Sequence, residues 1–269
     1  MFAGGIAGIA LFGADLSLTG NAALQPGANF LAARLLEWIG ATKCKRREEN
    51  REKKRPGLHP LILGTKRGIA NCERTISNSP RMIDPELLLQ GYRLGVFPMA
   101  MEDDSIGWFS PDPRAIIPFE NFHVPHALQR IARKKIFEIK IDNRFGEVIR
   151  ACAKREDTWI NSEIIESYQQ LHELGHAHSV EAWSNNKLAG GLYGVAVGGA
   201  FFGESMFHRV TDASKIALVA LVEHLRAKKF TLLDTQWITP HLAQFGAIEI
   251  SRTHYLRLLR RAVESPTKF

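Results

Sequence analysis

Apolar and polar residues are distributed differently in the first part of the chain and in the part that begins near Ile83. Residues 1–82 show no regular period, and they contain a Gly/Ala-rich start and a charged run at 43–55. A run of this kind is usually a solvated linker or tail. We therefore expect residues 1–82 to form an N-terminal extension that activity does not need, with Met82 as an alternative start.

From Ile83 onward, the apolar periodicity predicts a regular series of helices and strands. The first helix covers 86–94, with Asp84 as its N-cap and Gly95 as its end. A rigid loop with two prolines follows at 108–114. Further helices are expected at 126–135, 145–154, 163–174, 212–228, 241–245 and 252–264. The expected N-caps of the last three are Thr211 or Asp212, Thr239, and Ser251. Strands are expected at 137–141, 179–183, 188–197, 200–207 and 231–236.

The order of these elements indicates the fold class. Strands and helices alternate around a hairpin whose two-residue turn is Gly198-Gly199. This order predicts a mixed α/β or α+β layer architecture. We expect a small N-terminal domain at 83–122 and a larger domain at 123–269, which is compatible with an acyltransferase fold of the acetyltransferase-like type.

The chain has 269 residues and 45% hydrophobic content, which suits one large domain or two unequal ones. The net charge of +7 belongs to residues 1–82, which hold 13 Lys and Arg against 6 Asp and Glu. Residues 83–269 hold 22 of each sign, so bulk charge alone does not indicate a nucleic-acid partner.

No apolar run approaches the roughly 18 residues of a membrane span, so no membrane partner is expected. The three cysteines are far apart and form no C-x-x-C pair, which indicates neither a disulfide framework nor a zinc knuckle. A reducing cytoplasm is therefore the simplest location.

Several blocks of sequence carry a more specific signal. They lie at 95–98, 108–114, 173–183, 190–196, 202–207, 213–215, 233–236 and 242–247. In this order they resemble the bacterial leucyl/phenylalanyl-tRNA–protein transferases over roughly 83–263, whereas residues 1–82 are not covered. Met99 and Phe109 depart from the family, which commonly has an aromatic residue and a second tryptophan at these positions.

The resemblance implies a cytoplasmic aminoacyltransferase with a small N-terminal domain and an acetyltransferase-like domain. Such an enzyme takes Leu, Phe or sometimes Met from aminoacyl-tRNA and attaches it to proteins whose amino terminus is Arg or Lys. The modified terminus then marks the protein for a bacterial degradation pathway. Because the ester of Leu-tRNA or Phe-tRNA is already activated, neither a metal nor an organic cofactor is expected.

Asp234 and Gln236 are the first candidates for the catalytic site, on the block that resembles the family's catalytic segment. They are two residues apart on a predicted strand, so their side chains share one face. We expect Gln236 to position the attacking amine by accepting a hydrogen bond, with Asp234 polarising its amide. Alternatively, the polar pair caps the helix that begins after Thr239.

Glu204 is the third catalytic candidate, because a carboxylate in an apolar strand is costly unless it is paired. It would receive the cationic acceptor terminus or the Arg or Lys side chain of the acceptor. Strict alternation places it with Phe202 and Met206, opposite Phe201, and a bulge at Gly203 would bring both sets to one cleft. Alternatively, Glu204 forms an ordinary salt bridge to Lys215 or Arg209.

The amino-acid pocket must be apolar and must discriminate by shape. The candidates for its lining are Leu192, Phe201, Gly203, Met206, Leu221, Leu225 and Leu233. Their periodicity is equally typical of plain core packing.

Basic and aromatic residues supply the candidates for tRNA binding. Arg130, Arg133 and Lys134 lie one turn apart on one predicted helix face, which suits phosphate contacts or a merely solvated surface. Tyr92 and Trp159 are candidates for stacking on the terminal adenosine, or for the core.

A zinc site and three functions other than the family's are the alternatives. His176 and His178 would suit zinc, but no third ligand follows at a recognisable spacing. A coenzyme A-dependent acyltransferase is disfavoured because residues 206–214 lack the glycines of a pyrophosphate loop. A non-enzymatic RNA-binding protein is disfavoured by the neutral body, and a tRNA-dependent transferase with another acceptor by the motif set.

Overall fold

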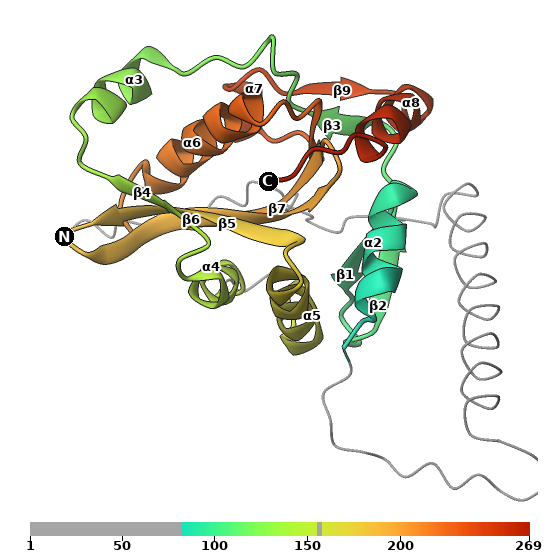
Figure 1. Ribbon diagram of the computed structural model, residues 1–269. Coiled ribbons are helices and arrows are strands. Elements are labelled where there is room, and N and C mark those ends of the chain that lie inside the picture. The colour runs from blue at the N-terminus through green and yellow to red at the C-terminus, as the bar shows by residue number, and fades with distance from the viewer. Residues whose placement is uncertain (1–81, 155–157) are drawn as a thin grey trace, which may run out of the picture.

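The computed structural model describes residues 82–154 and 158–269, so the prediction for the N-terminal extension lies almost wholly outside the described residues (Figure 1). A seven-stranded sheet with the order β4-β5-β6-β7-β8-β3-β9 forms the centre of the fold. Its strands are β3 (Arg114–Ile116), β4 (Glu138–Ile141), β5 (Ala177–Ser184), β6 (Lys187–Val197), β7 (Ala200–His208), β8 (Leu232–Gln236) and β9 (Ile248–Ile250). All neighbours pair antiparallel except β7 and β8, which are parallel.

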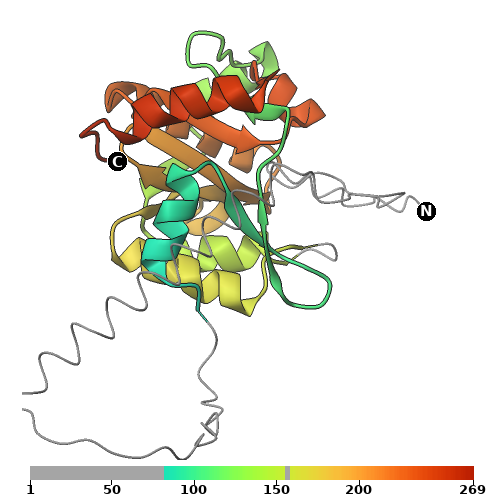
Figure 2. The same ribbon diagram turned by 90° about the vertical axis from the view of Figure 1, so that its right-hand side faces the viewer.

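Helices cover both faces of this sheet (Figures 1 and 2). One face packs against α3 (His126–Arg133), α6 (Ala213–Ala227) and α7 (Pro240–Ala243). The other packs against α2 (Pro85–Arg93), α4 (Phe145–Cys152), α5 (Ser162–Glu173) and α8 (Arg252–Val263). Two hydrophobic cores result, one on each face of the sheet. The mixed α/β fold class predicted from the sequence is confirmed.

Most helix boundaries follow the predicted capping residues. The side chains of Asp84, Thr239 and Ser251 accept hydrogen bonds from the first turns of α2, α7 and α8. At the start of α6 the predicted cap residue is in place, but the expected capping hydrogen bond from its side chain is absent. Asp212 stands at the N-cap with a left-handed φ of 68°, and its carboxylate binds the Lys215 amine at 2.6 Å instead of a helix N–H.

The region before the larger helices contains short strands that the periodicity did not indicate. β1 (Phe97–Ala100) and β2 (Ile106–Phe109) form a separate two-stranded sheet, and β3 begins at Arg114. The predicted loop at 108–114 is therefore wrong at both of its ends. Strands of three or four residues are too short to establish a period of two.

None of the helices in the part of the chain that the structure describes is long and apolar enough to cross a membrane.

Candidate active site

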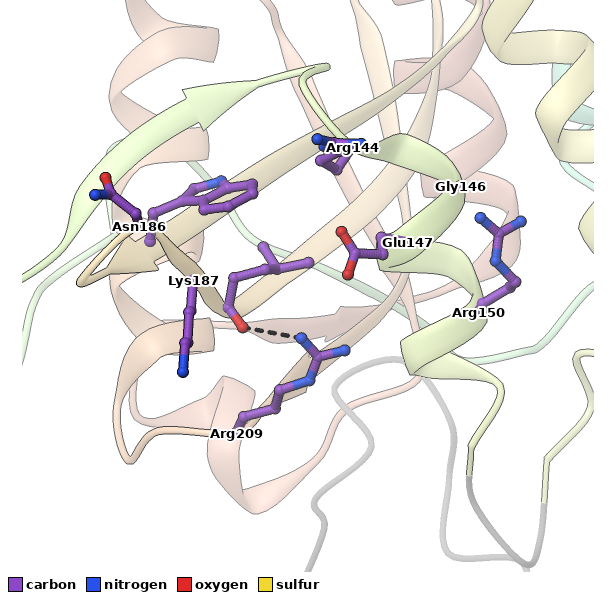
Figure 3. Close-up of a pocket in the computed structure, with 9 residues that line it drawn as sticks. Arg144, Gly146, Glu147, Arg150, Asn186, Lys187 and Arg209 are labelled. Atoms are coloured by element: carbon purple, nitrogen blue, oxygen red, sulfur yellow. Dashed lines mark hydrogen bonds between the residues drawn. The ribbon is translucent and has the colours of Figure 1, made fainter.

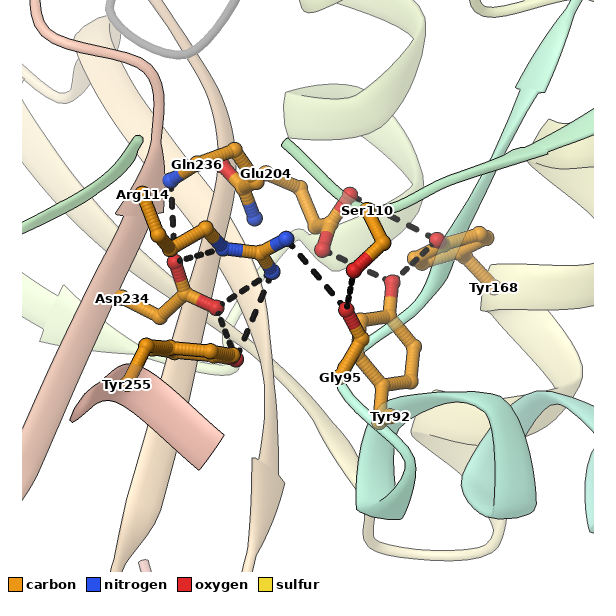
Figure 4. A network of polar contacts seen from close by, with 9 residues as sticks. All are labelled: Tyr92, Gly95, Ser110, Arg114, Tyr168, Glu204, Asp234, Gln236 and Tyr255. Atoms are coloured by element: carbon orange, nitrogen blue, oxygen red, sulfur yellow. Dashed lines mark hydrogen bonds and ion pairs between the residues drawn. The ribbon is translucent and has the colours of Figure 1, made fainter. Parts of the chain in front are cut away.

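A cavity of about 620 Å³ lies where α4 meets the turn between β5 and β6 (Figure 3). None of the predicted catalytic residues Glu204, Asp234 and Gln236 lines it. These three residues belong instead to a buried polar network on the same face of the sheet, under α2, α5 and α8 (Figure 4).

The first part of this network surrounds Glu204 on β7, whose side chain is 1% exposed. The Tyr92 hydroxyl on α2 donates to Glu204 Oε1 at 2.7 Å, and the Tyr168 hydroxyl on α5 donates to Oε2 at 3.4 Å. The two tyrosine hydroxyls also contact each other. Two helices far apart in sequence therefore hold one carboxyl group in place.

The second part surrounds Asp234 on β8. Arg114 binds the carboxylate in a bidentate manner, with Nε to Oδ1 at 2.9 Å and Nη2 to Oδ2 at 2.6 Å. The Tyr255 hydroxyl donates to Oδ2 at 2.6 Å, and the backbone N–H of Gln236 donates to Oδ1 at 2.9 Å. A fully buried ion pair is tolerated only when its remaining hydrogen-bonding capacity is satisfied, and this carboxylate accepts four hydrogen bonds.

Arg114 joins the N-terminal sequence blocks to this site. Its guanidinium carbon lies 4.9 Å from the ring centre of Phe97 and 4.6 Å from that of Tyr255. Its Nη1 donates to the carbonyl oxygen of Gly95 at 3.3 Å. The blocks at 95–98, 108–114, 202–207 and 233–236 thus meet in one place.

The environment of Glu204 raises its pKa to about 8, chiefly because burial disfavours the charged form. The hydrogen bond from Tyr92 and the charge of Arg114 oppose this shift in pKa, and the charge of Asp234 adds to it. Glu204 is therefore mainly neutral at pH 7. A group with this pKa is well matched to an α-amine, which titrates near ~8.

Glu204 should make the protein less stable as the pH rises from about 5 to about 8. An unfolded Glu ionises near its ordinary pKa of 4.5, whereas the folded Glu204 keeps its proton until its pKa of about 8. Between these values the folded state binds more protons, so the free energy of unfolding falls with increasing pH. Urea unfolding at several pH values should show that Glu204→Gln removes this fall. The exposed control Glu249→Gln should retain it, and an unchanged slope in Glu204→Gln would contradict the assigned pKa.

Gln236 ends β8 with a left-handed φ of 58°, and its side chain is 2% exposed. Neither Oε1 nor Nε2 has a hydrogen-bond partner among the described residues. An unpaired buried amide and a left-handed glutamine each cost free energy, and such costs concentrate at functional sites. The side chain is therefore available for a ligand.

Two predictions about Asp234 and Gln236 need revision. The Asp234 carboxylate contacts the backbone N–H of Gln236, so it does not polarise the side-chain amide as expected. The alternative, a polar pair that caps the following helix, is also not observed, since the Thr239 hydroxyl accepts the hydrogen bond from Leu242 itself.

The expected alternation along β7 is wrong at Met206. The pairing passes from Tyr193 and Ser205 to Gly194 and Gly203, so Glu204 has no opposite residue. This bulge turns Met206 into the core beneath α6, whereas Glu204 faces α2 and α5. The expected salt bridges are also replaced, because Lys215 binds Asp212 and Arg209 binds the Leu188 carbonyl.

The predicted amino-acid pocket lies on the opposite face of the sheet from Glu204. Six of its members are at most 2% exposed and belong to the core beneath α6: Leu192, Phe201, Met206, Leu221, Leu225 and Leu233. Gly203, the seventh, is also buried. The ring of the C-terminal Phe269 lies 5.3 Å from that of Phe201. In this structure these residues form closed packing, and a Leu or Phe side chain would have to displace some of it.

The predicted tRNA-binding residues are placed apart from one another. Arg130, Arg133 and Lys134 are exposed on and just after α3, which packs near α6 on the face opposite Glu204 (Figure 1). Tyr92 cannot stack on a base in this structure, because it is fully buried and its ring lies 4.8 Å from that of Phe202. Trp159 is partly buried, and its Nε1 has no partner among the described residues.

Sequence reasoning missed three residues of the network, namely Arg114, Tyr168 and Tyr255. Arg114 could have been recognised from the sequence, because it is directly followed by the apolar run 115–117 and is the last residue of one of the family blocks. The sequence did not distinguish the two tyrosines, because a tyrosine on an amphipathic helix is commonly part of the hydrophobic core. Within residues 82–154 and 158–269, no group of three His, Cys, Asp or Glu side chains is arranged to hold a metal ion.

Comparison with known proteins places this site in a family. Residues 116–260 match the model of the leucyl/phenylalanyl-tRNA protein transferases, and residues 81–112 match that of their N-terminal domain. A transferase of this name from Akkermansia muciniphila is 56% identical over 187 residues, which cover 68% of this chain and 97% of the relative. One from Herpetosiphon aurantiacus is 55% identical over 190 residues, covering 70% and 99%. The structure of L-PGS from Bacillus licheniformis is 10% identical with a TM-score of 0.37, covering 56% of this chain and 65% of that one, a likeness too remote to bear on function.

These matches define an acyl-transfer enzyme that uses aminoacyl-tRNA. The chain belongs to the leucyl/phenylalanyl-tRNA–protein transferase family. It is therefore an aminoacyltransferase that moves leucine or phenylalanine from aminoacyl-tRNA to the amino termini of proteins, and the family's role in degradation governed by the N-terminal residue comes with this membership. The family resemblance recognised in the sequence is confirmed.

Proposed function

We propose that this enzyme modifies proteins whose amino terminus is Arg or Lys, that it also accepts Met as the transferred residue, and that it works in the cytoplasm. We further propose that the network around Glu204, Asp234 and Gln236 is its active site. The observation that carries this proposal is the buried Gln236 amide without a partner, in the network that contains Glu204, whose pKa is raised to about 8.

The reaction is the aminolysis of an ester. The neutral α-amine of the acceptor attacks the ester carbonyl, and a new amide C–N bond replaces the C–O bond to the ribose. The amine nitrogen loses one proton, and the ribose oxygen leaves with one as a hydroxyl. Atoms and charges balance without a further reactant.

Glu204 supplies the neutral amine in this scheme. The acceptor arrives largely as an ammonium ion, because its pKa is near ~8. At pH 7 the ionised form of Glu204 is the minority, and this form takes the proton from the ammonium, a transfer that burial of the carboxyl group favours. Gln236 Oε1 then accepts a hydrogen bond from the amine and orients its lone pair toward the ester.

Asp234 and Arg114 position this amide and do not touch the substrate. Through Oδ1, Asp234 holds the backbone N–H of Gln236 and so fixes the left-handed turn that aims the side chain. Arg114 binds Asp234 through two hydrogen bonds in a fully buried ion pair, which fixes the position of the carboxylate.

We also propose that the smaller domain ends near residue 113, earlier than the predicted boundary at 122. β3, at 114–116, belongs to the seven-stranded sheet of the larger domain. The two family matches also divide between residues 112 and 116.

The acceptor proposal is tested with the purified enzyme, labelled Leu-tRNA and three peptides that differ only at their start. Transfer should be fast to peptides that begin with Arg or Lys and slow to the same peptide beginning with Ala. An N-acetylated Arg peptide should give none, because its nitrogen cannot attack. Equal rates for the Arg and Ala peptides would overturn the proposed acceptor while leaving the family activity intact.

A further inference from the structure

The cavity in Figure 3 is lined by four cations that come from three separate parts of the fold. Arg144 and Arg150 lie at the start and end of α4, Lys187 begins β6, and Arg209 follows β7. All four side chains are exposed, and among the described residues none is paired with a carboxylate. One carboxylate, Glu147, also lines the cavity, so positive charge remains in excess and the arrangement favours an anionic ligand.

Two of these side chains, Arg209 and Arg150, have contacts that bear on their position. Arg209 Nη1 donates to the Leu188 carbonyl at 3.1 Å, and its guanidinium carbon lies 5.4 Å from the Phe207 ring centre. Gly146 lies within α4, where a Cβ atom would come within 3.0 Å of Arg150 Nη2. Glycine is disfavoured in a helix relative to alanine, and here it leaves room for the Gln169 amide and the Arg150 guanidinium.

We propose that this cavity binds a backbone phosphate near the acceptor end of the donor tRNA, an inference that rests on the proposed active site. Arginine guanidinium groups match phosphate oxygens in a bidentate geometry and need no base sequence to do so. The tRNA is the polyanionic substrate of the reaction. The acceptor peptide is a poor alternative occupant, because its reactive terminus is cationic.

The position of the cavity fits this ligand. It lies on the same face of the sheet as Glu204, since α4 and α5 pack side by side on that face. Five residues of chain lead from Glu204 to Arg209, which at ~3.3 Å per residue is a span of roughly 16 Å. A single-stranded RNA end of a few nucleotides covers this span, with its last sugar at Glu204 and an upstream phosphate in the cavity.

Equilibrium binding of Leu-tRNA, measured against salt concentration, tests the proposal. The variant Arg144→Gln/Arg150→Gln/Arg209→Gln should raise the dissociation constant at low salt about tenfold or more. The slope of log K against log salt should become shallower by roughly 0.7–0.9, which is the value of one lost phosphate contact. The matched control is Arg257→Gln/Arg260→Gln/Arg261→Gln, which removes three exposed charges from α8 and should change neither quantity.

Two further measurements keep the outcome decisive. Because Arg209 also holds the Leu188 carbonyl, the double variant Arg144→Gln/Arg150→Gln should show the same effect in smaller measure if the triple variant folds poorly. Unchanged affinity and salt slope in folded variants would overturn the proposal, as would weakened binding of an acidic peptide with tRNA binding intact. At subsaturating tRNA, the single-turnover rate of the variants should fall together with the bound fraction of tRNA. A different result would overturn the proposed active site, namely variants of Glu204 or Gln236 that bind tRNA and transfer leucine at the wild-type rate.

Discussion

Replacing Gln236 by alanine should lower the single-turnover rate of leucine transfer by about 100- to 1000-fold and leave tRNA affinity nearly unchanged. The lost interaction is one hydrogen bond to the attacking amine, made best in the transition state. Hydrogen bonds of this kind in preorganised sites are worth roughly 2.7–4 kcal/mol. A change in rate without a change in affinity is the kinetic sign of such an interaction.

The same substitution should not weaken the fold, and this separates a substrate-binding role from a structural one. The Gln236 amide has no partner among the described residues, so no hydrogen bond is lost. Gln236→Gly, which tolerates the left-handed φ of 58°, should match the wild type in its free energy of unfolding or exceed it by up to ~1 kcal/mol. The exposed Gln244→Ala is the control for rate and stability. Wild-type rates in Gln236→Ala would remove the residue from the mechanism.

The sequence predicted the elements that contain the site better than the contacts within it. The long apolar patterns at 188–197 and 212–228 became β6 and α6, because a sustained period specifies which face is buried. Glu204 was singled out because a carboxylate among aromatic residues is conspicuous in any strand. Its partners Tyr92 and Tyr168 come from helices distant in sequence, and no local rule relates those positions.

The bulge on β7 explains why Met206 and Glu204 face opposite sides of the sheet. Strict alternation groups Glu204 with Met206. One extra residue in the strand turns the side chains that follow it to the other face of the sheet. The bulge itself was anticipated at Gly203, but its consequence depends on which residue is left unpaired. The contacts of Glu204 with α2 and α5 determine which residue is left unpaired, and the sequence of β7 alone carries no information about those contacts.

Replacing Arg114 by alanine should lower the free energy of unfolding by about 3–5 kcal/mol. The substitution leaves the Asp234 carboxylate fully buried without its bidentate partner, and it also removes the contacts with Phe97 and Tyr255. Urea unfolding measures the loss. Arg93→Ala is the matched control, because its ion pair with Glu86 is partly exposed and is worth no more than ~1 kcal/mol.

A double-mutant cycle distinguishes the ion pair from the general loss of a large side chain. Arg114→Met/Asp234→Leu removes both charges, so it should cost less than the sum of the two single variants by up to ~3 kcal/mol. Additive losses would mean that the two side chains act independently, contrary to the bidentate contact.

The same pair should also control catalysis through the Gln236 turn. Asp234→Asn removes the charge that holds the Gln236 N–H, so it should slow single-turnover transfer and move the reactive amide. Asp234→Asn/Gln236→Ala should then be little slower than the slower single variant, because residues that act as a unit are not additive. If the two losses multiply in full, Asp234 acts on the reaction by a route other than Gln236. A purely structural Asp234 would instead lower the melting temperature in Asp234→Asn while the rate per folded molecule stays at the wild-type value.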